Sequence, residues 1–213
     1  MERLLCLVIG YIFGLFQTGF ILGKLYHVDI REYGSGNSGT TNAMRVLGKK
    51  AGVITYLGDA FKALFAGLFV RLIFGDSDIL FVLLLYTGLG AILGHNYPFY
   101  MNFKGGKGIA ASSGAIAALG DWKLLLLALV TFVGVALISK YVSLASLCVL
   151  TGFFLELILF LVWGIMPNIG GSSPIEACII AFVWMIFAYI RHKDNIKRLI
   201  AGNERKIGQK IEV

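Results

Sequence analysis

The chain has 213 residues, of which 58% are hydrophobic and only 15% are charged. A soluble domain of this size could not bury so much apolar surface, so the composition excludes an ordinary soluble enzyme and predicts one polytopic membrane domain over residues 1–213. The formal net charge of +7 fits anionic lipid or an anionic substrate rather than nucleic acid, because the basic residues lie between and after apolar runs.

Apolar runs along the chain predict an all-α fold with seven transmembrane helices. Six of the runs are long, and their helices are expected at about 4–23, 51–74, within 79–103, 124–139, 142–163 and 175–190. The fourth run, 109–119, is short for a bilayer and rich in Ala, Ser and Gly, which favours a buried or partly inserted helix. Residues 164–174 are expected to form a loop, since they hold two prolines and three glycines.

Lysine and arginine are distributed very unevenly across this topology. With the N-terminus outside, 15 of them fall on the inside and three, Arg3, Arg71 and Lys123, on the outside. The positive-inside rule therefore predicts an outside N-terminus and a cytoplasmic C-terminus. Within the second run, Asp59 and Lys62 share a helix face; we interpret them as an ion pair that aids packing, with direct substrate contact as the alternative.

The first polar stretch on the inside runs from Arg31 to Gly52 and reads REYGSGNSGTTNAMRVLGKKAG. Its glycines let the backbone curl around an oxyanion, and its hydroxyl and amide groups offer hydrogen-bond donors. Thr41 or Asn42 is expected to N-cap a short helix, and Arg45, one turn later, offers a bidentate fork for phosphate. The alternative is a solvated, flexible connector.

The second stretch on this side is GHNYPFYMNFKGGKG, from Gly94 to Gly108. In its KGGKG turn, the missing Cβ atoms of two glycines would let backbone N–H groups approach an anion. The alternative is an ordinary loop whose lysines only obey the positive-inside rule. His95 is either a base or, as a lone histidine more often is, a hydrogen-bonded structural residue.

The third stretch is HKDNIKRLIAGNERKIG, from His192 to Gly208. If it begins as a helix, His192 and Asn195 lie on one face and can point at the other two stretches. The alternative is a basic helix on the membrane surface that binds anionic lipid. Together the three stretches suit the handling of phosphorylated small molecules. The sequence contains no Walker motif, metal-ligand cluster or serine-nucleophile elbow.

The strings GSGNSGTTNAMR, GHNYPFYMNFKGGKG and HKDNIKRLIAGNERKIG closely resemble, in order and spacing, the three motifs of the bacterial acyl-phosphate:glycerol-3-phosphate acyltransferase family. The resemblance covers nearly the whole chain, with Ser38 as one departure from an expected apolar residue. It implies a seven-span enzyme of the bacterial inner cell membrane, with its active site on the cytoplasmic side, no cofactor, no metal and a monomeric state. The implied reaction moves a fatty acyl group from acyl phosphate to the 1-hydroxyl of glycerol 3-phosphate and gives lysophosphatidic acid and phosphate.

By this resemblance, His192, Asn195 and Ser35 are the catalytic candidates. His192 and Asn195 would orient or deprotonate the attacking hydroxyl, and a substrate phosphate with a second pKa of about 6 is the alternative base. Candidates for substrate binding are Asn37, Thr41, Asn42, Arg45, Lys104, Gly105, Gly106, Lys107 and Ser143.

Within that set, Lys104 and the backbone of Gly105 and Gly106 are expected on the glycerol 3-phosphate side. Lys107 is expected to seat the following helix, and Glu204 to be a structural partner for lysines of the tail. Two other functions stay open. One is transport of an organic phosphate, against which the one-sided layout argues; the other is the same acceptor with acyl-CoA or acyl carrier protein as donor, although the HxxxxD pattern of that separate family is absent.

Overall fold

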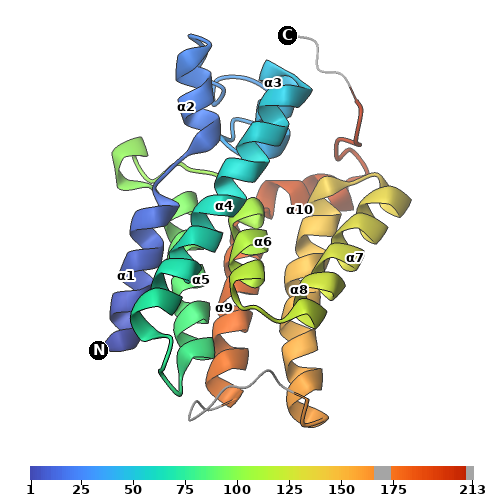
Figure 1. Cartoon of the computed structure of the whole chain (residues 1–213). Coiled ribbons are helices and arrows are strands. Elements are labelled where there is room, and N and C mark those ends of the chain that lie inside the picture. Colours follow the sequence, from blue (N-terminus) through green and yellow to red (C-terminus); the bar gives the residue numbers. More distant parts are fainter. Residues whose placement is uncertain (166–173, 210–213) are drawn as a thin grey trace.

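The computed structural model describes residues 1–165 and 174–209, and these form a helical bundle (Figure 1). The helices are α1 (Glu2–Gly14), α2 (Thr18–Leu25), α3 (Thr40–Leu47), α4 (Lys49–Phe74), α5 (Leu80–Asn96), the 3₁₀ turn η1 (Phe99–Met101), α6 (Ile109–Ala118), α7 (Trp122–Ser139), α8 (Val142–Val162), α9 (Pro174–Arg191) and α10 (Lys193–Ile200). The all-helical class is therefore confirmed. The expected loop at 164–174 lies almost entirely outside the described residues.

Six stretches of the described chain are long and apolar enough to cross a membrane, so this is a multi-pass membrane protein. They are Glu2–Leu25, Lys49–Phe74, Leu80–Met101, Trp122–Ser139, Val142–Val162 and Pro174–Arg191. The predicted fourth run forms α6, which is too short to span a bilayer unaided, as the sequence indicated. Leucines and isoleucines cover the outside of the bundle, as lipid contact requires; Ile138 is 87% exposed.

The first membrane stretch is not the continuous helix that its uncharged run predicts. Helix α1 ends at Gly14, the carbonyls of Gly14, Leu15 and Phe16 accept from side chains, and α2 begins at Thr18. No proline marks this interruption in the sequence. Its cause lies in side chains of α4 and the loop after α5, which bind the backbone groups that the break releases.

Helices α1 and α5 pack backbone against backbone along most of their length. A Cβ atom at Gly10 would overlap the carbonyl oxygen of Thr87, and one at Gly90 would overlap that of Leu7. Small residues permit such close approach between membrane helices, where dispersion contacts replace the hydrophobic effect. The glycines of the first span thus serve helix packing, and this packing fixes the side of α5 on which His95 lies.

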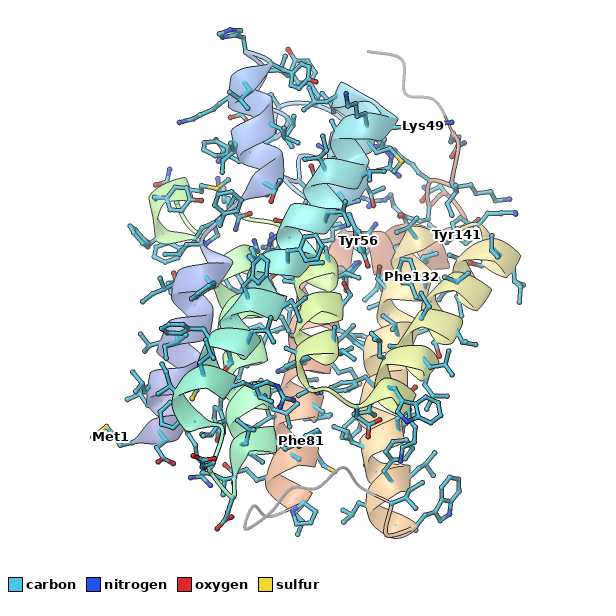
Figure 2. All side chains as sticks on the ribbon, viewed as in Figure 1. Met1, Lys49, Tyr56, Phe81, Phe132 and Tyr141 are labelled. Atoms are coloured by element: carbon cyan, nitrogen blue, oxygen red, sulfur yellow. The ribbon has the colours of Figure 1, made fainter. Side chains whose placement is uncertain are left out.

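Different elements lie at the two ends of the bundle. The N-terminus lies at one end, whereas α3, α10 and the C-terminal segment gather at the other (Figure 1). Figure 2 shows Met1 at the first end and Lys49 and Tyr141 toward the second. At the N-terminal end, Arg3 of α1 forms a two-pronged ion pair with Glu176 of α9.

Arg71, counted above as an outside charge, has a structural task. Its Nε donates to the carbonyl of Ala118 at 3.0 Å and its Nη2 to that of Leu119 at 2.6 Å. A cation at the C-terminus of a helix satisfies free carbonyls and is favoured by the helix dipole. The C-terminal end of the short α6 is therefore held by a side chain of α4.

The α1–α5 contact makes a testable prediction about stability. We expect Gly90→Ala to lower the melting temperature of the detergent-purified protein by roughly 2–12 °C, because overpacking costs about 1–3 kcal/mol. Gly134→Ala on α7 is the matched control, since a Cβ atom there meets nothing within 4 Å. Equal melting temperatures for the two variants would contradict the close-packing account.

Candidate active site

The KGGKG turn contacts the other two polar stretches, and the backbone groups of its two central glycines are all hydrogen-bonded within the protein. The N–H of Gly105 donates to the carbonyl of Asn96 at 3.1 Å, and that of Gly106 to the carbonyl of His95 at 3.0 Å. Arg191 donates to the carbonyl of Gly105 at 2.7 Å and to that of Gly106 at 3.0 Å. Asn37 from the glycine-rich stretch reaches the Gly105 carbonyl at 3.5 Å.

The two glycines of the turn are therefore packing positions. A Cβ atom at Gly105 would overlap the carbonyl oxygen of His95, and one at Gly106 would overlap the His95 ring at Nε2. Their N–H groups already donate within the protein, so the geometry does not offer them to a phosphate. This corrects the expectation that the backbone of Gly105 and Gly106 cradles an anion.

Lys107 reaches a group of polar side chains from two other elements. Its Nζ donates to Asn195 Oδ1 at 2.5 Å, and Asn195 Nδ2 donates to Glu204 Oε1 at 2.7 Å. Glu204 also accepts from Ser143 Oγ at 3.1 Å and from Arg198 Nε at 2.7 Å. We call these five residues the Glu204 cluster. Glu204 thus pairs with Arg198 rather than with the tail lysines that the sequence suggested.

Burial and charge shape the ionisation of this cluster. Burial, the largest cause, and the positive charges of Arg198 and Arg45 together lower the pKa of Lys107 to about 8, although the charge of Glu204 raises it. Burial alone would raise the pKa of Glu204, but hydrogen bonds from Asn195 and Arg198 outweigh it, so the pKa lies below its usual value. Near pH 7 both groups carry charge.

The cations around the cluster outnumber its single carboxylate. The half-buried Arg45 lies close enough to Arg205 and Arg198 for their charges, after burial itself, to lower its pKa. A guanidinium stays protonated even so. A cavity of about 590 Å³ opens beside Glu204 and is lined by Tyr141, Gly202, Asn203, Glu204, Arg205, Lys206 and Gln209. Such an excess of positive charge next to an open cavity favours anionic ligands.

His192 caps the start of α10 and is buried. Its Nδ1 lies 2.8 Å from the carbonyl oxygen of Ala188. Since a carbonyl only accepts, Nδ1 carries the proton and Nε2 has a free lone pair. Burial and the charge of Lys107 lower the pKa of His192 to about 4, so the imidazole is neutral near pH 7.

The glycine-rich stretch is held by a buried amide. Asn42 Nδ2 donates to the carbonyls of Ile30 and Tyr33, and its Oδ1 accepts from the Ser35 N–H at 2.8 Å. This side chain shapes the loop and has little capacity left for a substrate. Helix α3 is N-capped by Gly39, not by Thr41 or Asn42 as expected, because Asn37 Oδ1 turns back to accept from the Gly39 N–H.

The remaining sequence-predicted residues occupy different positions. The Ser35 side chain is exposed and Thr41 is partly buried in the first turn of α3. Lys104 is exposed, with no side-chain hydrogen bond in the described residues, whereas Lys107 joins the Glu204 cluster.

Three further residues at this end have surroundings that the sequence did not predict. In the sequence, Arg191 is only one of the 15 inside charges and Arg198 only one basic residue of the third stretch, yet both hold the site together. Thr40 Oγ1 is buried at the start of α3 without a hydrogen-bond partner among the described residues. Its place in a run of hydroxyl residues gave no signal that it differed from Thr41.

Comparison with known proteins places the chain among enzymes of one kind. The family model described as glycerol-3-phosphate acyltransferase matches residues 4–202. A glycerol-3-phosphate acyltransferase of Macrococcus caseolyticus (strain JCSC5402) is 40% identical over 97% of this chain and 98% of its own length. One of Alkaliphilus metalliredigens (strain QYMF) is 38% identical over 100% of both chains.

Two crystal structures of PlsY (YgiH), an integral membrane glycerol 3-phosphate acyltransferase, have a similar fold. The glycerol 3-phosphate form is 35% identical with a TM-score of 0.81, and the lysophosphatidic acid form is 34% identical with a TM-score of 0.80. Each comparison covers 98% of this chain and 96% of the other. The chain therefore belongs to the glycerol-3-phosphate acyltransferase family.

Proposed function

We propose that this protein transfers a fatty acyl group from acyl phosphate to the 1-hydroxyl of glycerol 3-phosphate, giving lysophosphatidic acid and phosphate. The Glu204 cluster is the observation that carries the proposal, because it gathers Lys107, Arg198 and the nearby Arg45 around one carboxylate beside an open cavity. The proposal is further supported by relatives and structures named for glycerol 3-phosphate acyl transfer. Two phosphates repel each other, and several fixed cations offset that repulsion.

The proposal includes a topology of seven crossings, with the N-terminus outside and the site on the cytoplasmic side of a bacterial cell membrane. Helix α6 would provide the seventh, shorter crossing. The 15-to-3 distribution of Lys and Arg supports this orientation. With the native cysteines replaced, Lys193→Cys should react with an impermeant maleimide in inverted vesicles and Asp76→Cys in right-side-out vesicles; the reverse pattern would reject the orientation.

The residues divide between the two substrates as follows. The Glu204 cluster binds glycerol 3-phosphate. Within it, Lys107 pairs with the phosphate, and Ser143 and Asn195 offer hydrogen bonds to the other polar groups. Arg45, Ser35, Asn37 and the start of α3 take the phosphate of the donor. Thr40 Oγ1, which has no partner in the described part of the chain, and Thr41 add hydroxyl donors there. Lys104 is exposed and serves as an outer cation for either phosphate.

Acyl phosphate is already an activated mixed anhydride, so no covalent enzyme intermediate is required. The 1-hydroxyl oxygen attacks the acyl carbon, the bond from that carbon to the bridging phosphate oxygen breaks, and phosphate leaves with the electron pair. His192 Nε2, free because Nδ1 donates to Ala188, accepts the hydrogen bond of the attacking hydroxyl. A histidine with a pKa of about 4 is a weak base, so its main contribution is orientation, and a substrate phosphate takes the proton.

A single reconstitution tests the function. Detergent-purified protein incubated with labelled glycerol 3-phosphate and palmitoyl phosphate should form labelled lysophosphatidic acid. Palmitoyl-CoA or acyl carrier protein in place of palmitoyl phosphate should give no product. Accumulation of unchanged glycerol 3-phosphate in protein-containing vesicles, without product, would instead indicate a transporter.

The role of His192 is tested by His192→Gln, which keeps a hydrogen-bonding side chain but removes the imidazole. We expect activity within about tenfold of wild type, since an obligatory general base typically contributes 10²–10⁴-fold. The measurement is kcat against pH for purified wild type and variant. A loss of more than about a hundredfold would assign the proton transfer to His192 instead.

The pKa of Lys107 makes a prediction about pH. Lys107 is charged below pH 8 and neutral above it, so the KM for glycerol 3-phosphate should rise roughly tenfold between pH 7 and 9, about the loss of one charge-assisted hydrogen bond. The substrate phosphate stays dianionic over this range. Lys107→Arg should flatten the dependence, because a guanidinium keeps its proton. The same rise in both enzymes would show that another group titrates.

A further inference from the structure

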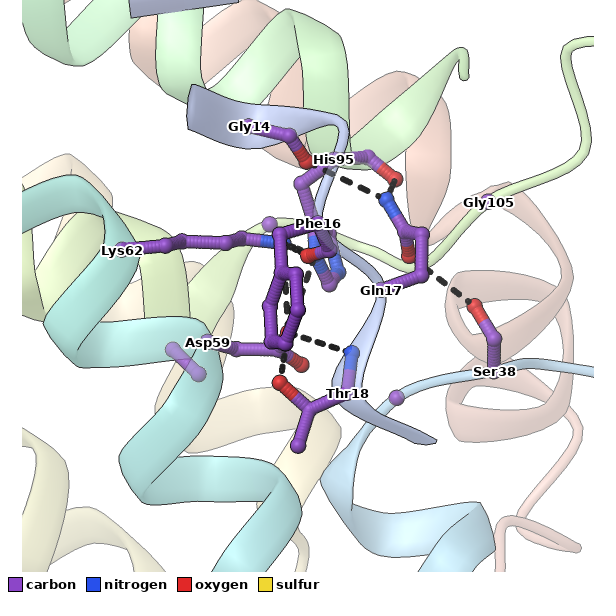
Figure 3. A network of polar contacts seen from close by, with 12 residues as sticks. Gly14, Phe16, Gln17, Thr18, Ser38, Asp59, Lys62, His95 and Gly105 are labelled. Carbon is purple, nitrogen blue, oxygen red and sulfur yellow. Dashed lines mark hydrogen bonds and ion pairs between the residues drawn. The ribbon is translucent and has the colours of Figure 1, made fainter. Parts of the chain in front are cut away.

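The break in the first membrane stretch releases backbone carbonyls, which bind one side chain of the break itself and two from distant elements. The carbonyl of Gly14 accepts from Gln17 Nε2 at 3.3 Å, that of Leu15 from the Tyr100 hydroxyl at 2.5 Å, and that of Phe16 from Lys62 Nζ at 2.5 Å. Figure 3 shows most of this network around the break. A break at this depth persists only because every released carbonyl finds such a partner.

Asp59 and Lys62 of α4 meet opposite ends of the two half-helices. The Lys62 ammonium lies at the C-terminal end of α1, and the Asp59 carboxylate accepts from the Thr18 N–H at 3.4 Å and hydroxyl at 3.2 Å at the start of α2. This places a cation at a negative dipole end and an anion at a positive one. The two side chains also pair with each other at 3.1 Å, which confirms the predicted ion pair.

The same lysine continues the network to the end of α5. Lys62 Nζ lies 2.8 Å from His95 Nδ1, and since an ammonium only donates, Nδ1 accepts and Nε2 carries the proton. The far edge of the His95 ring rests on Gly106 so closely that no Cβ atom fits between them. His95 is buried, being 2% exposed, so the sequence alternative of a structural histidine describes it.

A second connection runs from the break to the glycine-rich stretch. Gln17 is 1% exposed, and its Nε2 also donates to the carbonyls of Gly94 and His95 at 3.3 and 3.1 Å. Its Oε1 accepts from Ser38 at 3.5 Å (Figure 3). The break is therefore hydrogen-bonded to two of the three stretches that form the site.

We propose that Asp59 and Lys62 are positioning residues for the reaction, which hold the helix break and, through His95, set the place of the KGGKG turn. The chain of contacts runs from Lys62 to the His95 ring, from that ring to Gly106, and from the adjacent Lys107 to Asn195. Asp59 is 1% and Lys62 5% exposed, so in this proposal both act through their neighbours and not by touching a substrate. This inference rests on the proposed function, in which Lys107 binds glycerol 3-phosphate.

Steady-state kinetics on purified full-length variants test the proposal. Lys62→Met should lower kcat/KM about tenfold to hundredfold, as a misplacement of roughly 1 Å in a binding group does, mainly through a higher KM for glycerol 3-phosphate. The KM for palmitoyl phosphate should change less than that for glycerol 3-phosphate. Glu176→Gln removes an ion pair at the opposite end of the bundle and should leave both KM values unchanged.

The double variant Asp59→Asn with Lys62→Met guards against misfolding, because it leaves no single buried charge unpaired. If the double variant folds, with a melting temperature near that of wild type, and still shows the raised KM for glycerol 3-phosphate, the positioning role holds. Wild-type values for both KM would overturn it and make the network purely structural. Wild-type enzyme without any transferase activity in the same assay would reject the proposed function instead.

Discussion

Inside a membrane bundle, every backbone N–H and carbonyl has to find its partner within the protein, because hydrocarbon offers none. Two irregular segments of this chain lie against the bundle, the break over 15–17 and the Gly105–Gly106 turn. Side chains from α4, η1 and α9 reach the carbonyls of these segments. The requirement to satisfy irregular backbone thus brings together elements that lie far apart in the sequence, and the polar end of the bundle is assembled by it.

Positive charges gather at the same end of the bundle, and their repulsion acts against this assembly. Glu204 pairs with Arg198 and accepts a hydrogen bond from Asn195. Lys107 and Arg45 lie nearby, and no second carboxylate of the cluster balances their positive charges. Held close together and partly buried, these cations repel one another. In the proposed reaction, two bound phosphates would offset that repulsion. The same attraction between cations and phosphates would then also offset the repulsion between the two substrates.

Much of the fold can be predicted from the sequence. Long uncharged runs predict the helices that cross the membrane, and the short run at 109–119 predicts α6. The Asp59–Lys62 pair could also be predicted, because residues three apart share a helix face. The break could not: Leu15 and Phe16 are ordinary apolar residues, and their carbonyls are bound by Lys62 and Tyr100 from later in the chain. Local sequence carries no trace of such tertiary contacts.

The site shows the same division. The three stretches and their common face could be predicted from composition and charge. Which lysine of KGGKG enters the cluster could not, because both flank the same glycines and only Asn195 distinguishes them. Likewise Asn42 looks like a ligand in the sequence, whereas the folded loop uses up its amide. Sequence identifies groups that can bind phosphate, and the tertiary structure decides which of them are free to do so.

The broken first helix also bears on how the protein is made. Residues 15–17 enter the membrane before α4 and the loop after α5 have been synthesised, so Lys62 and Tyr100 are not yet present to bind their carbonyls. Until then the chain from Glu2 to Leu25 satisfies its backbone best as one uninterrupted helix. The interruption is consequently a late event of biogenesis, imposed when α4 arrives alongside. On this argument, the contacts around the break form only after the first membrane stretch has been inserted.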